Sequence, residues 1–96
     1  MSLTKEVFAA SDEIQNGRTL SDIMLHLATE HGELAQEVQI ASGASYKLPG
    51  SDGVVGKGVD LILCALDVIR RHDPSVTEED LIEIAKVKLA KWKQYS

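Results

Sequence analysis

The stretch LATEHGELAQEV, residues 27–38, consists mostly of strong helix formers and contains no proline. On a helical wheel, the apolar side chains here and in the preceding turn share one stripe, and Glu30 falls inside it. Glu37, His26 and Glu33 lie along one edge of this stripe. An ionised carboxylate that points at a core is costly unless it is paired or bound to a cation. The pattern predicts a helix that forms a groove wall, half apolar and half acidic. The apolar members of the stripe are Ile23, Leu27, Leu34 and Val38.

Two interpretations of these acids remain open from spacing alone. Three carboxylates within two turns are suited to binding a hard divalent cation through oxygen. Alternatively, they form an exposed acidic edge in which Glu30 pairs with a lysine, because glutamates at this spacing are common on helices.

Three further helices are predicted around this one. The first should run over residues 3–15, with Asn16 and Gly17 as its stop signal. Thr19 and Asp22 form a capping box that opens the second helix, which should continue to about Ala41. The third is expected over residues 54–72, before Pro74. A second capping box, Thr77 with Asp80, opens the fourth.

The segment between the second and third helices, residues 42–53, is rich in Gly, Ser, Pro and Asp and is predicted to be a loop. Tyr46 and Lys47 in this loop either cover a ligand or belong to a solvated turn.

The third predicted helix is apolar almost all round, which is typical of a central, buried helix. One polar stripe interrupts it, and its members project within about 80° of one another. Because polar groups on a buried helix need partners, we expect the glutamates of the second helix to line the same cleft. The alternative is an internal ion-pair ladder, with Asp67 and Arg71 as an i,i+4 pair. The stripe consists of Lys57, Asp60, Cys64, Asp67 and Arg71.

Length and composition favour one all-α domain over residues 1–96, since no strand pattern or repeat is found. The net charge of −5 argues against nucleic-acid binding. No apolar run reaches membrane-spanning length, and Lys5 and Glu6 interrupt any early signal-like stretch. The single Cys64 fits a reducing compartment, so a cytoplasmic location is expected. One of the four helices is apolar on nearly all sides, which leaves more apolar surface than one small chain can cover. A homodimer or homotetramer is therefore predicted.

Most catalytic patterns are absent from the sequence. Cys64 has no adjacent histidine, the three histidines lack the spacing of a zinc site, and no phosphate-binding glycine loop is present. Carboxylates from two facing helices remain, and such groups hold Mg²⁺ together with waters and substrate phosphates.

The motifs EHGE, residues 30–33, and KGVD, residues 57–60, are separated by 23 residues. With the four-helix pattern, they resemble the MazG-like family of all-α nucleoside triphosphate pyrophosphohydrolases. The resemblance covers residues 20–92. It implies Mg²⁺-dependent hydrolysis between the α and β phosphates, with Mn²⁺ as the alternative ion, in a dimer or dimer of dimers. It also implies that Glu30, Glu33 and Asp60 are the catalytic, metal-binding acids.

One position departs from the family pattern, because Lys57 stands where the first acid of the second motif is expected. A lysine cannot bind Mg²⁺. Either fewer ions bind, or Lys57 contacts phosphate, or the protein is inactive. We expect Lys57 to pair with Asp60 or with a glutamate of the second helix and so to weaken Mg²⁺ binding.

Three functions follow as hypotheses. The first is a house-cleaning pyrophosphohydrolase that acts on a standard or modified nucleotide. The second is a catalytically weakened nucleotide-binding or regulatory oligomer. The third is a structural oligomer in which the acids only form ion pairs. Lysines near the end of the fourth helix either face a polyphosphate or complement the helix dipole. The predicted substrate-binding residues are His26, Lys57, Lys91 and Trp92.

Overall fold

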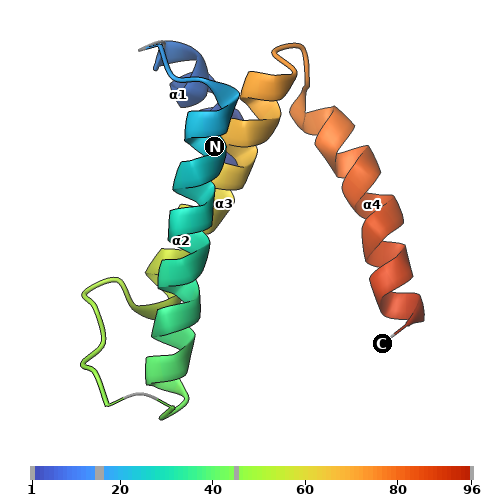
Figure 1. The fold of residues 1–96 in the computed structure, drawn as a ribbon. Coiled ribbons are helices and arrows are strands. Elements are labelled where there is room, and N and C mark those ends of the chain that lie inside the picture. Colours follow the sequence, from blue (N-terminus) through green and yellow to red (C-terminus); the bar gives the residue numbers. More distant parts are fainter. Residues whose placement is uncertain (1, 15–16, 45, 96) are drawn as a thin grey trace.

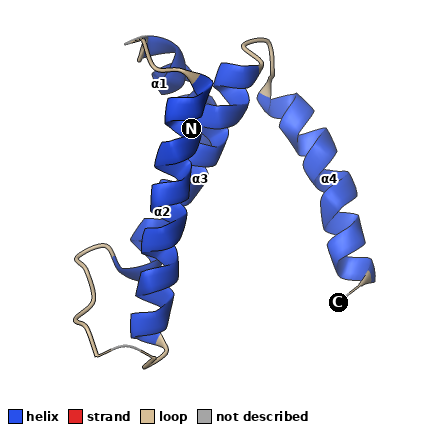
Figure 2. Ribbon diagram, in the orientation of Figure 1, coloured by secondary structure: helices blue, strands red, loops and turns tan. Residues whose placement is uncertain are grey.

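The computed structural model describes residues 2–14, 17–44 and 46–95. Four α-helices and no strand occur in these ranges, which confirms the all-α prediction (Figure 2). None of the described helices combines the length and apolar character needed to cross a bilayer. The helices are α1 (Leu3–Glu13), α2 (Leu20–Ala41), α3 (Gly53–His72) and α4 (Glu78–Gln94).

The helix starts follow the predicted local chemistry. Both capping boxes form: Thr19 and Thr77 accept the backbone N–H of Asp22 and Asp80, and the two aspartates accept the threonine N–H groups in return. α1 ends at Glu13, whereas the predicted last residue and Asn16 lie outside the described residues. Gly17 has a left-handed φ of 77°, as expected for a residue that follows a helix end.

α2 and α3 lie side by side along most of their length, and α1 packs against α3 (Figure 1). After the turn at residues 73–77, α4 runs away from the other helices and packs along neither α2 nor α3. Its first turn contacts the start of α1: the N-cap Ser2 donates a hydrogen bond to Glu78, and Lys5 Nζ lies 4.0 Å from Glu79. The predicted four-helix bundle is therefore not formed within one chain.

The core inside one chain is small. Phe8, Ile23, Cys64 and Val76 are its buried apolar residues, and no large described side chain is completely buried. The prediction that α3 is buried on all sides is wrong for a single chain, because its outer face has no covering helix. Val55 is 81% exposed, and other apolar residues of α3 are also accessible.

The contact between α1 and α3 is fixed by Asp67, which accepts hydrogen bonds from Ser11 at 2.5 Å and from Arg18 at 2.7 Å. The i,i+4 spacing predicts Arg71 as the partner of Asp67, whereas in the structure the closer cation is Arg18. Arg71 donates to the backbone oxygen of Arg18 at 2.7 Å, and its charge also helps to lower the pKa of Asp67. This network holds the start of α2 against α3.

Candidate functional site

Glu30 points into the contact between α2 and α3, as the helical wheel predicts. Its side chain is only 13% exposed, and its Oε1 atom lies 3.2 Å from His26 Nε2. Its second oxygen, Oε2, is buried and has no hydrogen-bond partner among the described residues. A buried carboxylate oxygen without a donor is unfavourable. Glu30 Oε2 is therefore the carboxylate oxygen of this region that lacks a donor among the described residues.

Lys57 lies between the two other acids of the predicted set. Its Nζ atom is 2.7 Å from Glu33 Oε2 and 3.7 Å from Asp60 Oδ2. The hydrogen bond to Glu33 raises the pKa of Lys57, and the same bond lowers the pKa of Glu33. The predicted ion pair is thus confirmed, with the α2 glutamate as the closer partner. Glu33 and Asp60 are therefore brought together by the ammonium group of Lys57, which lies between them.

The fit of this acid cluster to Mg²⁺ is partial. Carboxylate oxygens from two facing helices are the donors that this ion prefers, and Glu30 Oε2 is an orphaned buried oxygen. However, the described residues contain no group of three or more His, Cys, Asp or Glu side chains arranged to hold a metal ion. The ammonium of Lys57 lies where such an ion would neutralise Glu33 and Asp60. Metal binding here requires Lys57 to move aside.

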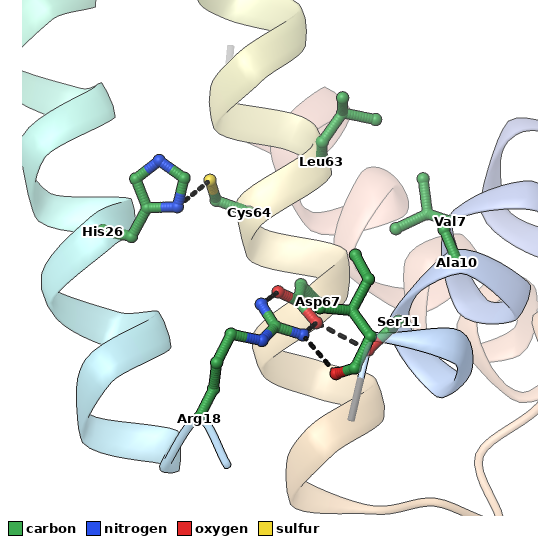
Figure 3. Close-up of a pocket in the computed structure, with 9 residues that line it drawn as sticks. Val7, Ala10, Ser11, Arg18, His26, Leu63, Cys64 and Asp67 are labelled. Atoms are coloured by element: carbon green, nitrogen blue, oxygen red, sulfur yellow. Dashed lines mark hydrogen bonds and ion pairs between the residues drawn. The ribbon is translucent and has the colours of Figure 1, made fainter. Parts of the chain in front are cut away.

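His26 connects the acid cluster to a neighbouring pocket. Its Nε2 atom faces Glu30, while its Nδ1 atom lies 3.8 Å from Cys64 Sγ (Figure 3). Burial and the nearby carboxylates raise the pKa of the Cys64 thiol. Cys64 is buried, which confirms the expectation that it belongs to the core, and its raised pKa favours the thiol over the thiolate.

The pocket beside His26 has a volume of about 270 Å³ and lies between α1 and α3. Val7, Ala10 and Leu63 form apolar walls, and the Arg18–Asp67 ion pair also lines the pocket (Figure 3). An apolar pocket with a few polar groups at its rim is the usual form of a small-molecule site. No sequence pattern predicts this pocket, because its walls come from helices that are far apart in the chain.

Glu37 is buried and accepts a hydrogen bond from the Gly50 N–H at 2.8 Å. The wheel placed Glu37 at the edge of the stripe with the other acids, but in the structure it ties the loop of residues 42–53 to α2. A side-chain carbon at Gly50 would lie 2.6 Å from Glu37 Oε1, so a larger residue there would require the end of the Glu37 side chain to shift. Tyr46 is fully exposed in this structure, and its role as a ligand cover stays a prediction.

Lys91 and Trp92 lie in the last part of α4, and Trp92 is 71% exposed. Because α4 packs along neither α2 nor α3, one chain does not bring these two residues to the acid cluster. Their substrate-binding role stays a prediction that depends on a second chain.

No family model, curated protein or solved structure matches this chain.

Proposed function

We propose that this protein is a weakly active, Mg²⁺-dependent nucleoside triphosphate pyrophosphohydrolase. The observation that supports the proposal best is the gathering of three acids between α2 and α3. Glu33 and Asp60 share Lys57, and the inward-facing Glu30 keeps one buried oxygen without a donor. The resemblance of the EHGE and KGVD motifs to the MazG-like family suggests the same chemistry for these acids.

In this proposal, Glu30, Glu33 and Asp60 hold the ion. When bound, Mg²⁺ would offset negative charge on the phosphates and favour attack by water. His26 lies between Glu30 and the apolar pocket, so it is placed to contact a base seated there while the phosphates face the acids. The pocket walls would exclude water from the base.

Lys57 is the reason to expect low activity. Its ammonium competes with Mg²⁺ for the carboxylates of Glu33 and Asp60, because two cations close together repel each other. A nucleotide-binding protein without turnover is the second candidate, and the same ion pairs support it. In that case a nucleotide would bind in the pocket while its phosphates remain intact.

A panel of nucleoside triphosphates, tested with Mg²⁺ and with Mn²⁺ for pyrophosphate release, examines the proposal. We expect slow release of pyrophosphate together with the nucleoside monophosphate, and none in EDTA. Calorimetric titration with α,β-methylene analogues measures binding without turnover. Binding without release supports the second candidate. Neither binding nor release contradicts both.

A further inference from the structure

The charges of α4 are divided between its two halves. The first half carries four carboxylates, and the second half carries four lysines. A helix with this division attracts an antiparallel copy of itself, since each acidic half then meets a basic half. A parallel copy would place like charges together. The acids are Glu78, Glu79, Asp80 and Glu83, and the lysines are Lys86, Lys88, Lys91 and Lys93.

An apolar seam runs along the same helix. Ile82, Ala85, Leu89 and Trp92 follow alternating steps of three and four residues, which is the spacing of a coiled-coil contact. The side chains of Ile82 and Leu89 are almost half exposed in the single chain, and Ala85 is exposed as well. Most helical stability in proteins comes from packing of an apolar face, and α4 packs along neither α2 nor α3, so we expect a partner for its seam.

The solvent-accessible surface of the single chain indicates how much area a packing partner of α4 could cover. A folded monomer of this mass is expected to expose roughly 5,400 Å², whereas this 10.4 kDa chain exposes 6970 Å². The excess of about 1,600 Å² is larger than the roughly 800 Å² that each partner contributes to a standard interface. A contact of standard size between two copies would therefore cover about half of this surplus.

From these observations we propose that α4 pairs with α4 of a second copy in an antiparallel, two-fold arrangement. The symmetry axis passes near Val87, which places Ile82 opposite Trp92 and Ala85 opposite Leu89. The small Ala85 lets the two helices approach closely. An isologous contact of this kind closes on itself, so it gives a dimer and not a filament.

The same register brings Glu79 of each copy close to Lys93 of the other. Glu79 and Lys93 are too far apart along one helix to interact within a chain. Lys86 and Lys88 flank the axis and bring like charges together there; the Glu83 carboxylate, 3.3 Å from Lys86, offsets part of this repulsion. Pairing of two α4 helices requires neither nucleotide nor metal, so it is independent of the proposed function.

Sedimentation of the full-length protein and its variants tests the inference. The wild type should be a dimer or a larger assembly, and Leu89→Asp should be a monomer with unchanged α1–α3 packing. Glu79→Lys or Lys93→Glu alone should weaken association by up to about tenfold. An equimolar mixture of these two variants, or one chain with both changes, should restore it. Circular dichroism and thermal unfolding check that each variant is folded.

Disulfide trapping tests the orientation, with Cys64→Ser as the background. Ala85→Cys mixed with Leu89→Cys should cross-link efficiently, whereas Ala85→Cys alone should not. Efficient linking of Ala85→Cys to itself would establish a parallel pair and contradict the inference. A monomeric wild type at micromolar concentration, or assembly that Leu89→Asp leaves unchanged, would overturn it as well.

Discussion

The Nζ atom of Lys57 on α3 lies 2.7 Å from Glu33 Oε2 on α2, and it is also 3.7 Å from Asp60 Oδ2. This contact joins the two short acidic motifs and places a fixed positive charge between them. Because the bond to Glu33 raises the pKa of Lys57, the charge persists through the neutral range. The predictions about metal binding follow from this one ammonium group.

Replacing the ammonium with a carboxylate should create a more complete metal site. Lys57→Glu removes the competing cation and adds an oxygen donor, so we expect Mg²⁺ affinity to rise about tenfold or more, together with pyrophosphate release. Mg²⁺ titrations of wild type and variant measure both quantities. A variant that is slower at every Mg²⁺ concentration would mean that Lys57 binds the substrate phosphates instead.

Lys57→Met is the matched control for this change. It removes the ammonium and keeps an apolar stem of similar length without adding a ligand. If competition dominates, this variant should also bind Mg²⁺ more tightly than the wild type, though less tightly than Lys57→Glu. Tighter binding only in Lys57→Glu would show that the missing ligand, not the competing charge, limits the site.

Glu30→Gln tests the inward-facing acid. The amide is nearly isosteric but neutral, so metal affinity and turnover should fall by about tenfold to a hundredfold. Helix content should stay unchanged, because no helix cap involves Glu30. The exposed Glu13→Gln on α1 is the control and should alter neither property. Unchanged turnover in Glu30→Gln would remove Glu30 from the predicted ligand set.

Asp67 should contribute to stability in a pH-dependent way. Burial raises the pKa of its carboxyl, but hydrogen bonds from Arg18 and Ser11 outweigh burial and lower it overall. The folded chain therefore holds the ionised form more strongly than the unfolded chain. This contribution to the free energy of unfolding is present above the ordinary pKa of about 3.9 and is lost as the pH falls through the lower, folded-state pKa.

Asp67→Asn should accordingly reduce the free energy of unfolding by about 2 kcal/mol at neutral pH, because charged hydrogen bonds are lost. The difference from wild type should shrink as the pH falls below about 4. Urea unfolding from about pH 6 to about pH 2 measures this. A difference that stays constant with pH would contradict the assigned role of the Asp67 charge.

Arg70 joins three parts of the chain, and its loss should be more harmful than the loss of any one partner. It donates two hydrogen bonds to Asp12 and one to the Val76 oxygen, and its guanidinium lies 5.1 Å from the Phe8 ring centroid. Arg70→Met should therefore lower the Tm more than Asp12→Asn, which removes the charge of the exposed ion pair but leaves the Val76 and Phe8 contacts of Arg70 in place. Equal Tm values would mean that the Val76 and Phe8 contacts contribute nothing measurable.

Much of the local structure could be predicted from the sequence by itself. Strong helix formers and the two Thr–Asp capping boxes determine where α2 and α4 begin, because these signals act within one turn of the chain. The helical wheel correctly predicted that Glu30 points inward. The shared polar stripe correctly predicted that Lys57 contacts an acid of α2. Periodicity fixes which side chains share a face, so residues on one face are predictable.

Only the tertiary structure decided what each face meets. Asp67 pairs with Arg18, and Glu37 holds Gly50, because chain segments that are remote in sequence pack there. The wheel likewise described α3 as apolar on nearly all sides but could not indicate that its outer face lacks a covering helix in one chain. The direction of α4 after the turn at residues 73–77 depends on tertiary contacts. Capping boxes and helix formers act within one helical turn, so they do not indicate which surface α4 packs against.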